Sequence, residues 1–247
     1  MIPLFYRLRQ VAVTASTNAD AKQAAEAGES EGLVFQALRQ TAGRGRQGRG
    51  WESPEGNLHT SILLRPCCSL QTAGHFSFVT ALAVHDAVRA FLPDADLALK
   101  WPNDVLVSGK KISGILLEAA PVENGVMEWL VIGIGVNVQH HPENGLYPAT
   151  SLQAEGAIQA EPQAVLETLL GALEGWCTML LREGFAPIRA AWLAKAQKGP
   201  VTARLPVETV NGEFSGLDEQ GRLILRLPDG AERAIAAGDV FFSGVGD

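Results

Sequence analysis

The chain has few cysteines, a shortage of positive charge and no long apolar segment. Its three cysteines, Cys67, Cys68 and Cys177, are odd in number and lack a CxxC spacing, so the sequence indicates neither a disulfide framework nor a zinc site. The formal net charge of -7 argues against a protein whose whole surface binds nucleic acid. No window approaches the ~20 apolar residues of a membrane span, and the first residues do not resemble an export signal. We therefore expect a cytoplasmic protein without a membrane partner.

The 247 residues, 47% of them hydrophobic, are enough for one full core and a small second one. Residues 17–20 have the form of a capping box, which predicts a helix over 17–27 that ends at Gly28. Apolar periodicity predicts further helices over 74–91, from Pro162 toward Gly184, and over 187–196. Strands are predicted at 33–39, 58–64, 97–100, 105–107, 110–117 and 128–138, with Ser108-Gly109 as a hairpin turn. This pattern favours an α+β fold with a mixed or mostly antiparallel sheet.

The sequence changes character near residue 199. Short apolar runs separated by turn signals follow, which is typical of a small β-barrel of some fifty residues. We predict two domains, residues 1–198 and residues 199–247.

The most informative segment spans residues 40–51, QTAGRGRQGRGW, and we call its residues 43–50 the arginine loop. Glycines let backbone N–H groups approach a ligand, and guanidinium groups donate paired hydrogen bonds to carboxylate or phosphate. A GxGxxG match occurs by letter, but Arg49, Gly50, Ser53 and Pro54 do not permit the helix that a dinucleotide site needs. A Walker A loop is also absent, because Lys111 stands where that motif has Ser or Thr. Any phosphate must therefore be held in another way.

Two downstream segments add to this pattern: residues 100–104, KWPND, and residues 110–115, KKISGI. Each has a simpler interpretation. The first could be an ordinary turn fixed by Pro102, Lys111 could be an exposed strand lysine, and Gly133 and Gly135 could mark close packing. The five histidines form no nucleophile or metal pattern. The three cationic segments together nevertheless favour phosphate chemistry.

Taken in order, five segments closely resemble bacterial biotin-protein ligases: residues 16–18 (STN), 40–51, 100–104, 111–118 (KISGILLE) and 132–137 (IGIGVN). The resemblance spans nearly the whole chain. It implies a catalytic domain like that of class II aminoacyl-tRNA synthetases, followed by a small SH3-like β-barrel. It also implies the monofunctional type, which has no DNA partner, because too few residues precede Ser16 for a winged helix. ATP, Mg²⁺ and biotin are the expected ligands, and the biotin carboxyl carrier protein of acetyl-CoA carboxylase is the expected acceptor.

The resemblance also assigns roles to residues. Those implied to bind biotin are Ser16, Thr17, Asn18, Gln40, Arg44, Gly45, Arg46, Lys111, Gly114, Leu116, Gly133 and Gly135. Those implied to bind ATP or the adenylate are Arg44, Arg46, Arg49, Trp51, Asn103, Lys111 and Asn137. The catalytic candidates are Arg46, Lys111, Asp104 and Lys100. Asp104 could bind Mg²⁺ or orient and deprotonate the acceptor lysine, and the sequence does not separate these roles.

Glycine-rich loops lose much entropy on ordering, so we expect the arginine loop to be disordered without ligand and to close over the adenylate as a lid. Three alternatives stay open from the residues alone: a lipoate-protein ligase, an Arg/Gly RNA-binding module, and a ligand sensor without turnover. The RNA module predicts more stacking aromatic residues near the arginines than Trp51 alone. A homodimer stays open, since the edge strands that would form it are not recognisable.

Overall fold

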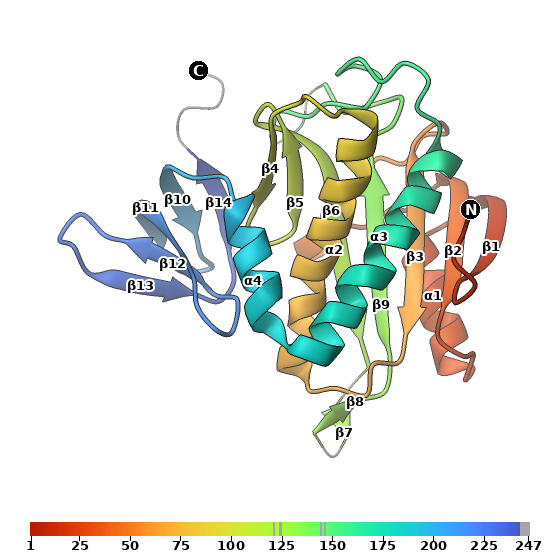
Figure 1. The fold of residues 1–247 in the computed structure, drawn as a ribbon, viewed down its shortest axis with the longest axis horizontal. Coiled ribbons are helices and arrows are strands. Elements are labelled where there is room, and N and C mark those ends of the chain that lie inside the picture. The colour runs from red at the N-terminus through yellow and green to blue at the C-terminus, as the bar shows by residue number, and fades with distance from the viewer. Residues whose placement is uncertain (121, 124, 144, 146, 243–247) are drawn as a thin grey trace.

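The computed structural model describes residues 1–120, 122–123, 125–143, 145 and 147–242. Its main element is a seven-stranded mixed sheet in the order β1-β2-β3-β9-β6-β5-β4 (Figure 1). Only β1 and β2 are parallel. The strands are β1 (Arg7–Thr14), β2 (Leu33–Gln40), β3 (Leu58–Leu64), β4 (Leu97–Lys100), β5 (Asp104–Val107), β6 (Lys110–Ala119) and β9 (Leu130–Val136). The α+β class and the mixed sheet are as expected.

Two long helices cover one face of this sheet, α2 (Leu70–Phe91) and α3 (Pro162–Glu183), and α4 (Phe185–Ala194) packs against both. The alternation of side chains along β9 explains the arrangement, because Ile132 and Ile134 are buried on the helix side while Gly133 and Gly135 face the opposite side. On that opposite side lies the start of α1 (Thr17–Glu26), which contacts β2, β3 and β9. The glycine-lined face is therefore the one left for a site.

Several predicted boundaries need correction. Helix α2 begins at Leu70 rather than residue 74, because the Ser69 hydroxyl caps it by accepting from the Thr72 N–H at 3.2 Å. Helix α4 begins at Phe185 rather than residue 187, directly after Gly184, whose φ of 77° breaks the chain away from α3. The strand predicted over 128–138 is shorter at both ends, and a small hairpin of β7 (Val122–Glu123) and β8 (Val126–Met127) precedes it. The Ser108-Gly109 turn is confirmed, since both residues have positive φ, 49° and 75°.

The capping box at residues 17–20 was wrong. Ser16 is the N-cap of α1, and its side chain makes no capping hydrogen bond. The acceptor comes instead from Gln40, whose Oε1 accepts from the Thr17 backbone N–H at 2.8 Å and from the Thr17 hydroxyl at 3.1 Å. A residue distant in sequence thus replaces the local cap.

Strand β1 was not predicted. It is an edge strand whose side chains are mostly exposed, so its apolar pattern is weak, and β2 fixes it by parallel pairing. The sequence analysis found no segment that approaches a membrane span, but α3 is long and apolar enough to cross a membrane by length and composition. Its residues Val165, Leu169 and Leu173 are fully buried, and the helix packs along α2, as expected of a core helix.

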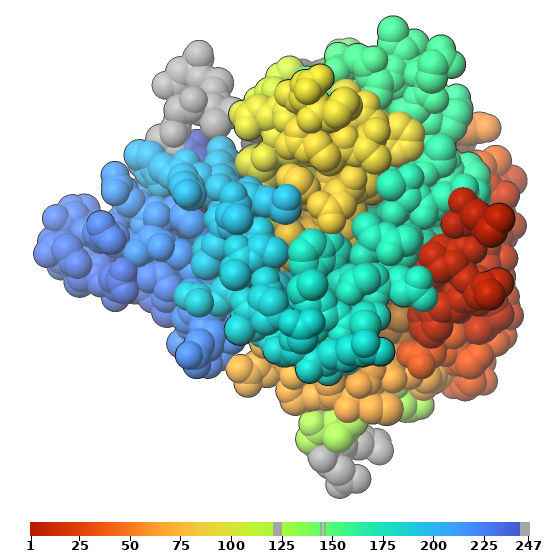
Figure 2. Space-filling view, viewed as in Figure 1, coloured from red at the N-terminus to blue at the C-terminus, as the bar shows by residue number. Residues whose placement is uncertain are grey.

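Residues 200–242 form a separate five-stranded antiparallel sheet in the order β13-β12-β11-β10-β14. Its strands are β10 (Pro200–Arg204), β11 (Thr209–Leu217), β12 (Leu223–Arg226), β13 (Glu232–Ile235) and β14 (Asp239–Phe242). Within the described residues β13 and β14 do not pair, so the sheet is open where a closed barrel was expected. Figure 2 shows this segment, in blue, packed against the α4 region. The buried indole of Trp101 donates to the Gly221 carbonyl at 3.0 Å and ties the two sheets together.

Candidate active site

A cavity of about 260 Å³ opens on the glycine-lined face of the large sheet. Every residue to which the sequence analysis assigned a role lines this one cavity: Ser16, Thr17, Asn18, Gln40, Arg44, Gly45, Arg46, Arg49, Trp51, Lys100, Asn103, Asp104, Lys111, Gly114, Leu116, Gly133, Gly135 and Asn137. Residues as far apart in the sequence as Ser16 and Asn137 therefore lie around the same cavity. Their convergence makes the cavity the candidate active site.

The floor of the cavity is bare backbone. In the pairing of β6 with β9, Gly114 lies opposite Gly135, and Leu116 lies opposite Gly133. A Cβ on Gly133 would overlap the side-chain amide of Asn18, and a Cβ on Gly135 would overlap the indole of Trp51. The glycines are therefore required because other side chains lie directly on them.

One end of the cavity is a network of hydroxyl and amide side chains, most of them buried. The Ser61 hydroxyl bridges the Thr17 hydroxyl at 2.7 Å and the Asn18 Oδ1 at 2.6 Å. Gln40 joins the network through Thr17 and donates through Nε2 to the Ser53 hydroxyl at 2.9 Å. Because these groups are fixed by one another before a ligand arrives, this end can recognise a small neutral polar ring.

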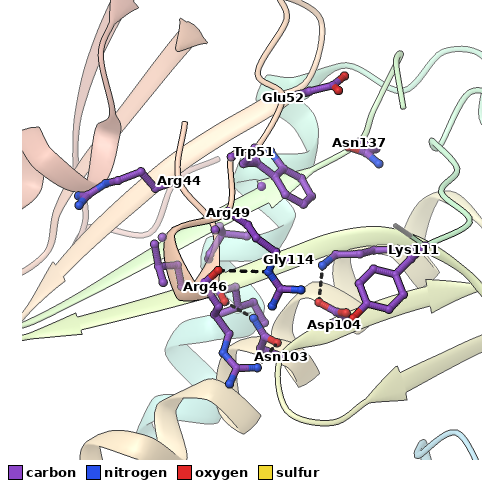
Figure 3. A pocket seen from close by; sticks show the side chains of 18 of the residues that line it. Arg44, Arg46, Arg49, Trp51, Glu52, Asn103, Asp104, Lys111, Gly114 and Asn137 are labelled. Carbon is purple, nitrogen blue, oxygen red and sulfur yellow. Dashed lines mark hydrogen bonds and ion pairs between the residues drawn. The ribbon is translucent and has the colours of Figure 1, made fainter. Parts of the chain in front are cut away.

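The arginine loop covers the cavity, and its arginines have three different partners. Arg44 pairs with Glu118 of β6 at 3.0 Å, and Arg49 pairs with Asp239 of β14 at 2.7 Å. Arg46 donates to the Asn103 side-chain oxygen at 3.4 Å, and Figure 3 shows the two side chains lying close together. Burial lowers the pKa of Arg46 from its ordinary value. Among the described residues Arg46 has no carboxylate in ion-pair range, so it is the guanidinium most available to an anionic ligand.

The other end of the cavity holds two lysines around one carboxylate. Lys111 Nζ lies 2.6 Å from Asp104 Oδ1, and Lys100 Nζ lies 3.8 Å from Asp104 Oδ2. Lys100 is buried, and its ammonium lies 3.9 Å from the centre of the Tyr147 ring. Burial lowers the pKa of Lys100, and the nearby Asp104 offsets part of that change. This end is a desolvated cluster of charge suited to phosphate groups.

Three lining or adjoining residues were missed. Glu118 stands inside a quoted motif, but only its contacts with Arg44 and Asn18 reveal its position. Tyr147 and Asp239 also border the cavity. Asp239 comes from the C-terminal sheet, 190 residues after its partner Arg49, and no local pattern links the two. Contacts of this range are set by the tertiary fold.

The site combines a polar end with a cationic end suited to an anionic ligand, and the comparisons with known proteins identify the family. Residues 11–137 match the Biotin/lipoate A/B protein ligase family, and residues 200–243 match the Biotin protein ligase C terminal domain. The chain belongs to the biotin/lipoate A/B protein ligase family.

Its relatives include the biotin–[acetyl-CoA-carboxylase] ligase of Paracoccus denitrificans, 43% identical over 95% of this chain and 100% of the relative. The enzyme of that name from Mycobacterium tuberculosis is 35% identical over 95% of this chain and 88% of the relative. Among solved structures, the Aquifex aeolicus biotin protein ligase in complex with biotin and ATP superposes with a TM-score of 0.81. That pair is 28% identical and covers 96% of this chain and 99% of the other.

Proposed function

We propose that this protein is a biotin-protein ligase, which joins biotin to ATP as biotinyl-5'-adenylate and then transfers biotin to a lysine of a biotin carboxyl carrier protein. One observation carries the proposal: a single cavity has a neutral polar end, a bare glycine floor and a cationic end, covered by one arginine-rich loop. The full-length similarity to named biotin ligases supports the same activity over the lipoate alternative.

Biotin has a ureido ring, an apolar thiophane ring and a valeryl carboxylate. We assign the ureido ring to the network of Thr17, Asn18 and Gln40, beside which Ser16 also lines the cavity, because these side chains supply both donors and acceptors. The apolar part would lie on the floor of β6 and β9, beside Leu116 and next to the Asn18 side chain that covers Gly133. The carboxylate would then point toward Lys111. This orientation follows the polarity of the cavity from one end to the other.

In the first step a carboxylate oxygen attacks the α-phosphorus of ATP, and the bond to the β-phosphate breaks with pyrophosphate as the leaving group. The carboxylate is ionised at neutral pH, so no base is needed, and the barrier lies in bringing anions together. Each cation at ~4 Å contributes about 4 kcal/mol of gross attraction at an effective dielectric near 20, before desolvation. We assign this charge to Arg46 and Lys111, which both line the cavity, and to the neighbouring Lys100.

Magnesium enters this scheme with ATP. Mg²⁺ keeps several waters and binds proteins through one or two carboxylates together with substrate phosphates. Among the described residues no group of three His, Cys, Asp or Glu side chains could hold a metal, and Asp104 already faces two ammonium groups. The donor set therefore fits a metal carried by the phosphates better than a resident ion. A direct role for Asp104 at the metal stays a prediction.

In the second step the neutral amine of the acceptor lysine attacks the acyl carbon, and AMP departs with the electron pair of the broken bond. A proton must leave the amine, and we assign Asp104 to orient the amine and to accept that proton. The 2.6 Å contact with Lys111 supports the orienting part of this assignment, because an ammonium group already lies against the same carboxylate. We place this reaction in the cytoplasm. We also retain the division at residues 198 and 199, which the start of β10 at Pro200 supports.

The test is to incubate purified protein with MgATP and biotin, and to measure pyrophosphate release and then biotin transfer to a carrier domain. Lipoate is the matched acid, and reactions lacking the acid or the carrier are the controls. We expect release with biotin and transfer to one lysine of the carrier. Equal activity with lipoate, or biotin binding without pyrophosphate release, would contradict the proposal.

A further inference from the structure

The indole of Trp51 lies directly on the bare floor of the cavity. Its Cζ3 atom is 3.1 Å from the position that a Cβ on Gly114 would take, and its ring occupies the space that a Cβ on Gly135 would need. Because Gly114 and Gly135 are paired across β6 and β9, they form one flat patch that fits an aromatic ring. Figure 3 shows the ring extending from the loop toward Lys111, whose ammonium is 5.6 Å from the ring centre.

Trp51 also closes the neck of the arginine loop. Its backbone N–H donates to the Gly43 carbonyl at 2.9 Å, and next to this pair Arg44 and Gly50 form a β-bridge. Further in, the Gly45 N–H donates to the Arg49 carbonyl at 2.7 Å. The loop is therefore a narrow hairpin that begins and ends beside the indole. The position of the indole therefore also determines the direction in which the arginine side chains of the loop point.

We propose that Trp51 is a positioning residue whose indole docks the arginine loop on the Gly114–Gly135 patch and so determines how long the site stays closed over its intermediate. This inference rests on the proposed function and changes the role that the sequence suggested for Trp51. The ring contacts the protein floor, and the guanidinium groups that follow from its placement contact the ligand. Gly135 is the floor residue on which the indole packs, because any side chain there would push the indole away.

The decisive experiment is a double-mutant cycle of Trp51→Ala and Gly135→Ala. Gly135 is not in the left-handed region of φ, so alanine fits the backbone of β9. Each single variant should accelerate loss of bound biotinyl-adenylate about tenfold, the effect of removing one aromatic contact. If Gly135→Ala acts by displacing the indole, it should have no further effect once Trp51 is alanine. The double variant should then lose adenylate about tenfold faster than wild type rather than about a hundredfold.

Gly133→Ala is the matched control, because it lies two residues away on the same strand and its methyl group would meet Asn18 rather than Trp51. Its effect on biotin binding should be the same with and without Trp51. Trp51→Phe should restore most of the adenylate retention, since a phenyl ring can still lie on the glycine patch. A merely structural role would give no such rescue and would lower the thermal unfolding midpoint of every variant alike.

A second measurement does not depend on the reaction. Trypsin cleaves after arginine, so cleavage at Arg44, Arg46 and Arg49 reports the undocked loop. Cleavage in the ligand-free protein should increase in Trp51→Ala and Gly135→Ala, and no further in the double variant. Additive effects in both assays would overturn the docking role while leaving biotin ligation intact. Absence of any adenylate in the wild type would instead count against the proposed function. The trypsin result would still test whether the Trp51 indole docks on the Gly114–Gly135 patch.

Discussion

The ion pair between Arg49 and Asp239 connects the arginine loop to the C-terminal sheet, so removing it should open the site without touching its floor. The atoms are 2.7 Å apart, and the two side chains are 37% and 23% exposed. At an effective dielectric near 20 the gross attraction is about 6 kcal/mol, and partial exposure reduces the net value to about 1 kcal/mol. Asp239→Asn should therefore lower the ratio of closed loop to open loop about fivefold.

The assay is biotin-dependent exchange of pyrophosphate into ATP. We expect Asp239→Asn and Arg49→Gln each to raise the apparent KM for ATP about fivefold, with a smaller change in kcat, and the double variant to resemble either one. The difference in KM between the variants and the wild type should shrink as the salt concentration rises from about 0.1 to about 1 M, because the Debye length falls to about 3 Å. Glu208→Gln, which breaks the ion pair with Arg233 on the same sheet, is the control and should leave KM unchanged. Additive single effects, or no dependence on salt, would refute the reasoning.

Three further predictions concern the site and the core. Arg46→Gly should release adenylate and label bystander lysines, which a blot of total biotinylated protein detects; full retention of the adenylate would count against the lid. Lys111→Met should reduce pyrophosphate release about 100-fold, because a cation at the developing charge is lost, while binding of biotin changes less. Burial lowers the pKa of His75, so its stabilising effect is present above pH ~6.5 and is lost as pH falls toward the folded pKa. Urea unfolding at pH 7.5 and 5.5 should show that the wild type loses more stability on acidification than His75→Phe does.

The motifs could be predicted because they are local. The glycines of β9, the arginine loop and the lysines of residues 100–111 each have a pattern within a few positions, and their residue types suit one chemistry. Long amphipathic elements such as α2 and α3 could also be found from periodicity. The side chains that contact these motif residues could not be predicted from local patterns. Glu118, Tyr147 and Asp239 carry no local signal, since an isolated carboxylate or tyrosine is normally a surface residue.

The error at α1 has the same origin. A capping box is a local rule, and residues 17–20 satisfy it by letter. In the folded chain Gln40 supplies the acceptor for the Thr17 N–H, which leaves the Thr17 hydroxyl to join Ser61. The helix start is thus built into the polar end of the cavity. A local rule fails here because the groups that it would satisfy are committed to the site.

The charges of the cavity suggest why carboxylates hold the loop. The wall carries cations whose mutual repulsion would otherwise open an unliganded site: Arg44, Arg46, Arg49, Lys100 and Lys111. Glu118, Asp104 and Asp239 offset part of that repulsion and leave a net positive cavity in an acidic chain. Incoming phosphates meet cations already in position, so little reorganisation remains at the moment of reaction. Among the residues that the structure describes, the side-chain partner of Arg46 is the Asn103 amide, so Arg46 can turn to the ligand without breaking an ion pair with any of them.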